Sequence, residues 1–298
     1  MQKRNNIIIG DLIIDQNYIT EPSGKSAEFN ARKFKLIEKN LNLGGAGMVF
    51  SALKKLDNNA NFLTIAQSKY KKIFNKLQLT DIIFSDKITI EKKRYWENNK
   101  LLFQLNNIKF DQKEIRKFQT KLLKKINKIK NQSNILLCDY RYGIFSNEFT
   151  KKIIRIFKKK NCELYVDQQS TSLNPDIGKF KNVNYLILNL DEYNKIFKIY
   201  KIKEKTLLKK LTKLQKILSI NTFVVKRGSK GCSIFKNKGI ISATVDKKRK
   251  QSINTIGAGD YFLSAFVINR TRSNLQRIKF SNNYAYSKII GKSKVKTF

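Results

Sequence analysis

The sequence alternates between two kinds of segment, and this alternation limits the fold more than any other feature. Short apolar runs lie near residues 7–14, 61–65, 135–138, 163–167, 185–189 and 222–226. Elsewhere apolar residues recur every three or four positions with Lys between them, as in residues 115–129. The first pattern is typical of buried strands and the second of amphipathic helices. We therefore expect an α/β fold: a doubly wound, mostly parallel sheet with helices on both faces, in a single domain over residues 1–298.

Polar residues and a glycine stand at or near the ends of the apolar runs. They are Asp11, Asp15, Asp139, Asn189 and Gly228. In an open α/β sheet, ligands bind beyond the carboxyl ends of the strands. The sequence therefore predicts a ligand site at that edge.

The charge is strongly positive. Lys and Arg number 62 against 22 Asp and Glu, so the formal net charge is +40. A nucleic-acid footprint should form a patch, whereas these Lys residues are spread over nearly every segment. We expect no specific nucleic-acid site, and a basic binding module stays open as an alternative.

Composition excludes several chemistries. The absence of His removes His-based general bases, catalytic triads and the commonest zinc ligand. Three Cys without metal-ligand spacing indicate reduced thiols. No apolar run is long enough for a signal peptide or a membrane span, so we expect a cytoplasmic protein.

A small-residue motif, Gly257-Ala258-Gly259-Asp260, precedes the apolar run at 261–268. Small residues leave backbone N–H groups accessible, and the N-terminus of a helix attracts anions. Asp260 would then lie in the first turn, beside the bound anion. The alternative is an acidic N-cap on a tightly packed helix. These residues alone leave both interpretations open.

The motif follows Thr255 near the C-terminus and resembles the signature of the ribokinase-like (PfkB) carbohydrate kinases. The resemblance implies that Asp260 is the catalytic base. It also implies that the amides of Gly257, Ala258 and Gly259 hold the transferred phosphoryl group. The remaining family pattern follows in the same order along the whole chain.

The loop Gly44-Gly45-Ala46-Gly47-Met48 resembles the glycine loop of one branch of this family, the D-glycero-β-D-manno-heptose 7-phosphate kinases. Met48 stands where that branch has Asn. The resemblance implies that Gly44, Gly45 and Asp15 bind the acceptor sugar.

Two further residues are expected near the acceptor. Arg94 lies in a stretch similar to the heptose kinases and could contact a substrate phosphate, or it could be an ordinary exposed charge. Asp139 matches a family turn in which Arg141 and Tyr142 replace Gly and Lys.

Segments 16–43 and 87–107 are expected to form a small β lid. The first has mixed polar and apolar alternation, and the second has two strand-like runs around Asn98-Asn99. A homodimer through this lid is a further expectation.

The nucleotide side is also implied by the resemblance. Asn189 and Glu192 match an Asn-x-x-Glu motif that orders the water shell of Mg²⁺, and they could equally form a capping box. ATP would lie near Lys226, Gly228, Gly231 and Asn283, for which exposed turn residues are the alternative.

Together these features predict an ATP-dependent sugar kinase, with heptose 7-phosphate as the expected acceptor. The alternatives are a catalytically impaired relative that acts as a basic binding module, or a kinase for fructose, ribose or a nucleoside. Many relatives bind a monovalent cation through an Asp and a Thr before the Gly-Ala-Gly motif. Asn254 and Ile256 occupy those positions, so we expect a weak response to K⁺.

Overall fold

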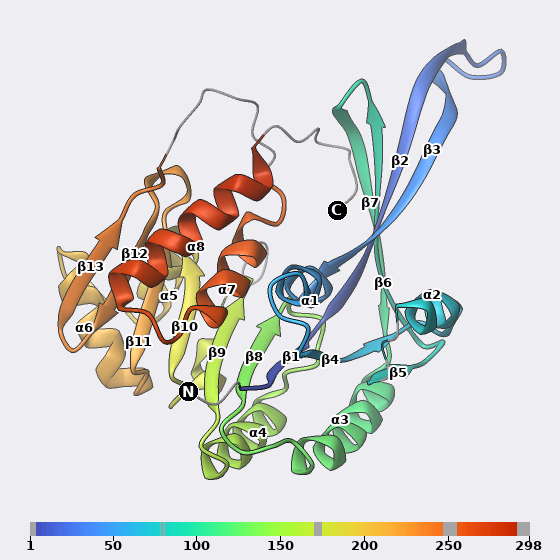
Figure 1. The fold of residues 1–298 in the computed structure, drawn as a ribbon. Coiled ribbons are helices and arrows are strands. Elements are labelled where there is room, and N and C mark those ends of the chain that lie inside the picture. Colours follow the sequence, from blue (N-terminus) through green and yellow to red (C-terminus); the bar gives the residue numbers. More distant parts are fainter. Residues whose placement is uncertain (1–3, 78, 80, 170–174, 247–254, 291–298) are drawn as a thin grey trace.

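The computed structural model describes residues 4–77, 79, 81–169, 175–246 and 255–290, and it is built around a nine-stranded sheet (Figure 1). The strand order is β13-β12-β11-β10-β9-β8-β1-β4-β5. The strands are β1 (Asn6–Gly10), β4 (Ala60–Ala66), β5 (Ile82–Phe84), β8 (Asn134–Asp139), β9 (Glu163–Gln168), β10 (Tyr185–Asn189), β11 (Thr222–Lys226), β12 (Cys232–Lys236) and β13 (Gly239–Ala243). Pairing is parallel from β5 through β11 and antiparallel at β12 and β13. The predicted doubly wound, mostly parallel sheet is confirmed.

Helices pack around this sheet. One group consists of α1 (Ala46–Lys54), α7 (Ala258–Ile268) and α8 (Asn274–Ile289). Helix α7 lies between the other two and contacts both of them. The other helices are α2 (Lys71–Lys76), α3 (Gln112–Asn127), α4 (Asn147–Lys159), α5 (Leu190–Ile199) and α6 (Leu207–Leu218). In α3, Asp111 caps the first turn, while Ile115, Phe118 and Leu122 are buried. The Lys-rich face remains outside, as the periodicity predicts.

Helix α7 differs from the surface helices because it is apolar nearly all round. Residues 261–267 are buried without a break. Such a helix is stable only in the interior, where α1 and α8 cover it. The sides of α7 are therefore covered. Its N-terminus, at Gly257, lies at the edge of the sheet.

A second sheet of four strands, in the order β3-β2-β6-β7, stands out from the body of the molecule (Figure 1). It consists of β2 (Leu12–Lys25), β3 (Arg32–Gly45), β6 (Ile88–Glu97) and β7 (Lys100–Phe110). Strands β2 and β6 pair in parallel, and each forms an antiparallel hairpin with its other neighbour. The β6–β7 turn uses Asn98 and Asn99 with positive φ angles of 46° and 64°, as a tight hairpin turn requires.

The sequence predicted reduced thiols and no membrane span. Cys138, Cys162 and Cys232 are free thiols, all of them buried. Among the residues that the structure describes, no helix is long and apolar enough to cross a membrane.

Candidate active site

A cavity of about 440 Å³ lies where β9, β10 and β11 end and helix α7 begins. Its wall includes the expected catalytic, nucleotide and metal residues Asn189, Glu192, Lys226, Gly228, Gly231, Gly257, Ala258, Gly259 and Asp260. These residues come from three separate segments of the chain. The fold therefore brings the motif at the start of α7 to the carboxyl ends of the strands.

The Asp260 carboxyl group lies in the first turn of α7 and faces this cavity. Burial raises its pKa from 3.8 to about 7, and the negative charge of Asp167 adds to the shift. Two groups act in the opposite direction, the hydroxyl of Tyr140 and the ammonium of Lys226. A carboxylate with a pKa near 7 is a stronger base than an exposed one, and at neutral pH much of it is still free to accept a proton.

The turn before α7 is shaped by glycine. Gly257 has a left-handed φ of 78°, which glycine adopts without strain. A side chain at Gly257 would lie 3.0 Å from the methyl group of Met48, so Met48 packs against this turn. The first N–H groups of a helix have no partner within it, and Gly257, Ala258 and Gly259 line the cavity. The Ala258 N–H donates to the Thr255 carbonyl at 3.2 Å, in the turn before the helix. The geometry suits an anion at the start of α7.

Lys226 extends from the end of β11 to the same place. A side chain at Gly259 would lie 3.3 Å from its Nζ atom. The Nζ atom is 3.2 Å from a carboxylate oxygen of Asp167, at the end of β9. Burial alone would lower the pKa of Lys226, but Asp167, Glu192 and Asp260 outweigh burial and raise it. Lys226 is therefore a permanent cation at the start of α7.

Asp167 lines the cavity but was not assigned a role from the sequence. The signal that could have identified it is the one that selected Asp15 and Asp139, an acidic residue at the end of an apolar run. Tyr140 was missed for a different reason: its partner, Asp260, is 120 positions away.

Asn189 and Glu192 form a complete capping box at the start of α5. The side chain of Asn189 accepts from the Glu192 N–H at 2.8 Å, and a Glu192 carboxylate oxygen accepts from the Asn189 N–H at 2.8 Å. Both residues also line the cavity. The two interpretations of this motif are therefore compatible in the structure.

Of the residues expected to bind the acceptor, the structure brings together Asp15 of β2, Gly44 of β3 and Arg94 of β6. The Nη1 atom of Arg94 lies 2.9 Å from a carboxylate oxygen of Asp15. A side chain at Gly44 would collide with that carboxylate, and Gly45 has a left-handed φ of 58°. Burial raises the pKa of Asp15, whereas Arg94 and Lys92 oppose the shift.

The sequence pattern of the pfkB family carbohydrate kinases matches residues 3–285. The chain belongs to this family. Curated relatives include the bifunctional protein HldE of Aliarcobacter butzleri, 24% identical over 98% of this chain and 62% of that protein. HldE of Campylobacter jejuni strain RM1221 is 25% identical over 87% of this chain and 55% of that protein. The kinase chain thus spans little more than half the length of these relatives.

Solved structures of PfkB-type kinases share the fold. Phosphofructokinase-2 from Escherichia coli in complex with fructose-6-phosphate superposes with a TM-score of 0.74 at 14% identity, covering 96% of this chain and 94% of that one. Ribokinase from Arabidopsis thaliana complexed with ribose and ATP gives a TM-score of 0.70 at 14% identity, covering 98% and 95%. This carbohydrate kinase therefore has the ribokinase-like architecture.

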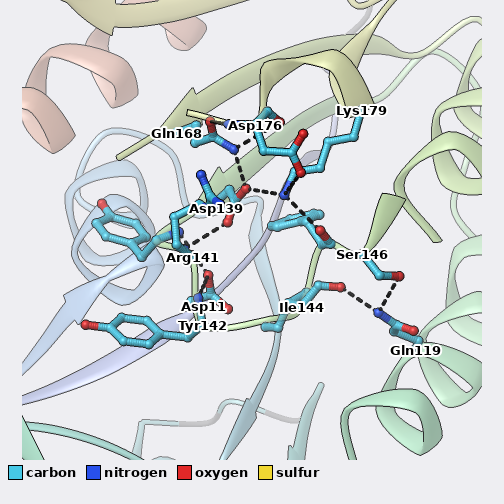
Figure 2. Close-up of polar contacts among 12 residues, drawn as sticks. Asp11, Gln119, Asp139, Arg141, Tyr142, Ile144, Ser146, Gln168, Asp176 and Lys179 are labelled. Atoms are coloured by element: carbon cyan, nitrogen blue, oxygen red, sulfur yellow. Dashed lines mark hydrogen bonds and ion pairs between the residues drawn. The ribbon is translucent and has the colours of Figure 1, made fainter. Parts of the chain in front are cut away.

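Asp139, an expected acceptor residue of this kinase, has a different environment. It is buried with 1% exposure, and its carboxylate receives Lys179 Nζ at 2.8 Å and Gln168 Nε2 at 2.6 Å (Figure 2). It also accepts from the Arg141 N–H at 2.9 Å. Because these partners occupy the carboxylate, we assign Asp139 to holding the turn after β8 and give it no substrate contact.

Asn283 was expected beside adenine, but the structure places Asn282 on the cavity wall instead. Asn283 is exposed and accepts a hydrogen bond from the Asp246 N–H at 3.2 Å. Successive residues of a helix point about 100° apart. A shift of one position in α8 therefore moves the side chain from the cavity to the surface.

Of the positions expected to weaken a cation site, Asn254 lies outside the described residues. Ile256 is described, with 38% of its side chain exposed. A hydrocarbon side chain there supplies no oxygen ligand.

Proposed function

We propose that this carbohydrate kinase transfers the γ-phosphoryl group of ATP to a hydroxyl of a heptose 7-phosphate. The observation that carries the proposal is the position of the Asp260 carboxyl group at the start of α7, in one cavity with Lys226. A general base, backbone amides and a cation then surround the point of transfer. Phosphoryl transfer depends mainly on such positioning and electrostatics.

In the proposed reaction, Asp260 takes the proton of the acceptor hydroxyl as its oxygen bonds to the γ-phosphorus atom. The bond from that phosphorus to the bridging oxygen breaks, and ADP leaves with the electron pair. The amides of Gly257, Ala258 and Gly259 would hold the phosphoryl oxygens. Lys226 would offset the negative charge that they carry.

ATP would occupy the rest of the cavity. Both Gly228 and Gly231 line the cavity and have positive φ angles, 56° and 82°. Gly228 has open space where a side chain would lie, so its backbone would approach the phosphates, whereas Gly231 packs against the Ala243 carbonyl. The far wall includes the apolar side chains of Val245, Ala285 and Ile289. We assign this apolar wall to the adenine ring.

Mg²⁺ would be held at Glu192 and Asn189 largely through its own water molecules. Both side chains supply oxygen, the donor that Mg²⁺ prefers. Within the described part of the chain, no group of three or more His, Cys, Asp or Glu side chains could bind a metal directly. When bound, Mg²⁺ would neutralise charge on the phosphates of ATP.

Two observations favour a phosphorylated acceptor. Arg94 and Lys92 come from the same face of β6 and lie near Asp15, so the acceptor side carries two cations against one carboxylate. In addition, the curated relatives quoted above are HldE proteins. Asp15 and the Gly44-Gly45 loop would bind sugar hydroxyls, and the cations would bind the phosphate.

The second sheet would act as a lid and as a dimer surface. It exposes large apolar side chains that a monomer would leave in water: Leu36, Ile37, Leu101, Phe103, Leu105 and Ile108. Exposed apolar patches of this kind commonly mark interaction surfaces. We infer a homodimer through this sheet, which sedimentation of the purified protein would test.

The deciding experiment offers the purified protein ATP with a panel of acceptors: a heptose 7-phosphate, the same heptose without phosphate, fructose 6-phosphate, fructose, ribose and adenosine. Product formation is followed by ³¹P NMR. We expect the heptose 7-phosphate to show the highest kcat/KM. A preference for ribose or adenosine would overturn the acceptor, and no turnover with any acceptor would favour the binding-module alternative.

A further inference from the structure

Tyr140 lies in the turn between β8 and α4, and the mechanism above does not use it. Its side chain is 8% exposed, and its hydroxyl donates a hydrogen bond of 2.8 Å to Asp260 Oδ1. We propose that Tyr140 is a positioning residue that orients the Asp260 carboxylate for proton transfer. With Oδ1 held by Tyr140, we assign Oδ2 as the atom that accepts the proton of the acceptor hydroxyl. The inference rests on the proposed role of Asp260 as base.

The backbone around Tyr140 is held firmly enough to aim the hydroxyl. The buried carboxylate of Asp11 accepts from the Tyr140 N–H at 2.9 Å and from the Tyr142 N–H at 3.2 Å. The preceding residue, Asp139, is anchored by the buried Lys179 (Figure 2). Because these contacts already hold the backbone on either side of the Tyr140 ring, the side chain loses little conformational freedom when its hydroxyl binds Asp260.

The charges around Asp260 explain why such a donor matters. The carboxylates of Asp167, on β9, and of Asp15, on β2, oppose ionisation of Asp260, as does burial. Lys226, on β11, and the Tyr140 hydroxyl favour it. Cys138 of β8 and Tyr261 of α7 also face Asp260, and both are neutral near pH 7 because their pKa values are raised. A hydrogen bond donated to a carboxylate stabilises the charged form. Tyr140 therefore helps to keep the base ionised near neutral pH.

The test is Tyr140→Phe, which removes one oxygen and keeps the ring. The acid limb of the kcat/KM profile should move to higher pH by about one unit, since a donor to a charged group is lost. At pH values on the acid limb, kcat/KM of the variant should be about tenfold lower than that of the wild type. At pH 9 the two values should be nearly equal. A uniform loss at every pH, or an unchanged profile, would overturn the inference.

Tyr165→Phe is the matched control. The hydroxyl of Tyr165 also donates to a carboxylate at 2.8 Å, that of Glu163, but at the opposite end of β9 from Asp167. Tyr165 is fully buried as well. This variant should be less stable and should keep the wild-type pH profile. A shift equal to that of Tyr140→Phe would show that the effect is not specific to Asp260.

A measurement without catalysis separates this inference from the proposed function. The carboxyl carbon of Asp260 is titrated by ¹³C NMR in protein labelled at aspartate, with Asp260→Asn used to assign the signal. The pKa of Asp260 should be higher in Tyr140→Phe than in the wild type. If this shift appears but no acceptor is phosphorylated, the proposed function fails while the Tyr140–Asp260 coupling stands. If the protein phosphorylates its acceptor and the pKa does not move, the inference about Tyr140 fails.

Discussion

The two sides of the candidate site carry opposite excesses of charge. On the side proposed for phosphoryl transfer, Asp167, Glu192 and Asp260 lie around the ammonium of Lys226. On the side proposed for the acceptor, Arg94 and Lys92 flank the carboxylate of Asp15. In the proposed reaction, the carboxylates beside Lys226 would disfavour a nucleotide without its metal cation, whereas the cations beside Asp15 would attract an acceptor that carries a phosphate. This difference in charge is consistent with the proposed placement of the two substrates.

The two sides are also built differently. The phosphoryl-transfer side uses the start of a helix and the ends of parallel strands, where short motifs set the geometry. The acceptor side depends on an ion pair between Asp15 and Arg94, on strands β2 and β6 of the second sheet. Activity should therefore respond to single substitutions in the short motifs of the phosphoryl-transfer side. On the acceptor side, it should respond to changes in strand pairing and charge.

The largest effect should come from Asp260→Asn, which keeps the shape of the side chain and removes the base. Turnover should fall by at least the roughly 10²–10⁴-fold contribution of a general base. Calorimetric titration with ATP should show binding close to that of the wild type. Near-normal turnover with unchanged ATP binding would refute the assigned mechanism.

Arg94→Gln should act on the acceptor alone. Losing a charged hydrogen bond should raise the KM for a phosphorylated acceptor by about ten- to one-hundredfold, with little change in the KM for ATP. The control is Arg32→Gln, because Arg32 lies in the same sheet in an exposed pair with Glu97 at 2.7 Å. Equal effects of the two variants, or an equal effect on the acceptor that lacks phosphate, would argue against a phosphate contact.

The pH dependence of stability should also depend on Asp260. The pKa of Asp260 is raised to about 7, so the folded protein holds a proton that the unfolded chain releases near pH 4. Wild-type stability should therefore fall as the pH rises through this window. Asp260→Asn has no such proton, so its Tm should exceed the wild-type value by a few degrees at pH 8 and by less at pH 4. Thermal unfolding at both pH values measures the difference.

A smaller effect is expected from monovalent cations beside the phosphoryl-transfer side. Ile256 supplies no oxygen ligand, so replacing K⁺ by a bulky organic cation at constant ionic strength should change activity by less than about twofold. Initial rates in the two buffers give the answer directly. Strong activation by K⁺ would mean that other groups form a cation site.

The smallest effect should be on nucleic acids, because the positive charge is distributed over the whole sequence. DNA should bind without sequence preference, more weakly than about micromolar at physiological salt, and affinity should decline steeply as salt rises. Fluorescence anisotropy with several oligonucleotides over a salt series measures both properties. One oligonucleotide bound thousands of times more tightly than the others would support the binding-module alternative.

The sequence by itself determined the features that depend on neighbouring residues. Apolar periodicity predicted the parallel sheet and its helices, and the Gly257–Asp260 motif located the start of α7. The capping box of Asn189 and Glu192 was also predicted as one interpretation, because its two hydrogen bonds span only three positions. These features are local, so a short window of sequence contains all the groups involved.

Only the tertiary structure decided which distant groups meet. The hydrogen bond from Tyr140 to Asp260 spans 120 positions, and the ion pair of Lys226 with Asp167 spans 59. The buried ion pair of Asp139 with Lys179 also joins positions that are far apart in the sequence. In α8, helix rotation decided between Asn282 and Asn283. Sequence patterns show how each segment is shaped but not which atoms face each other, and the pKa of Asp260 depends on those facing charges and on the exclusion of water.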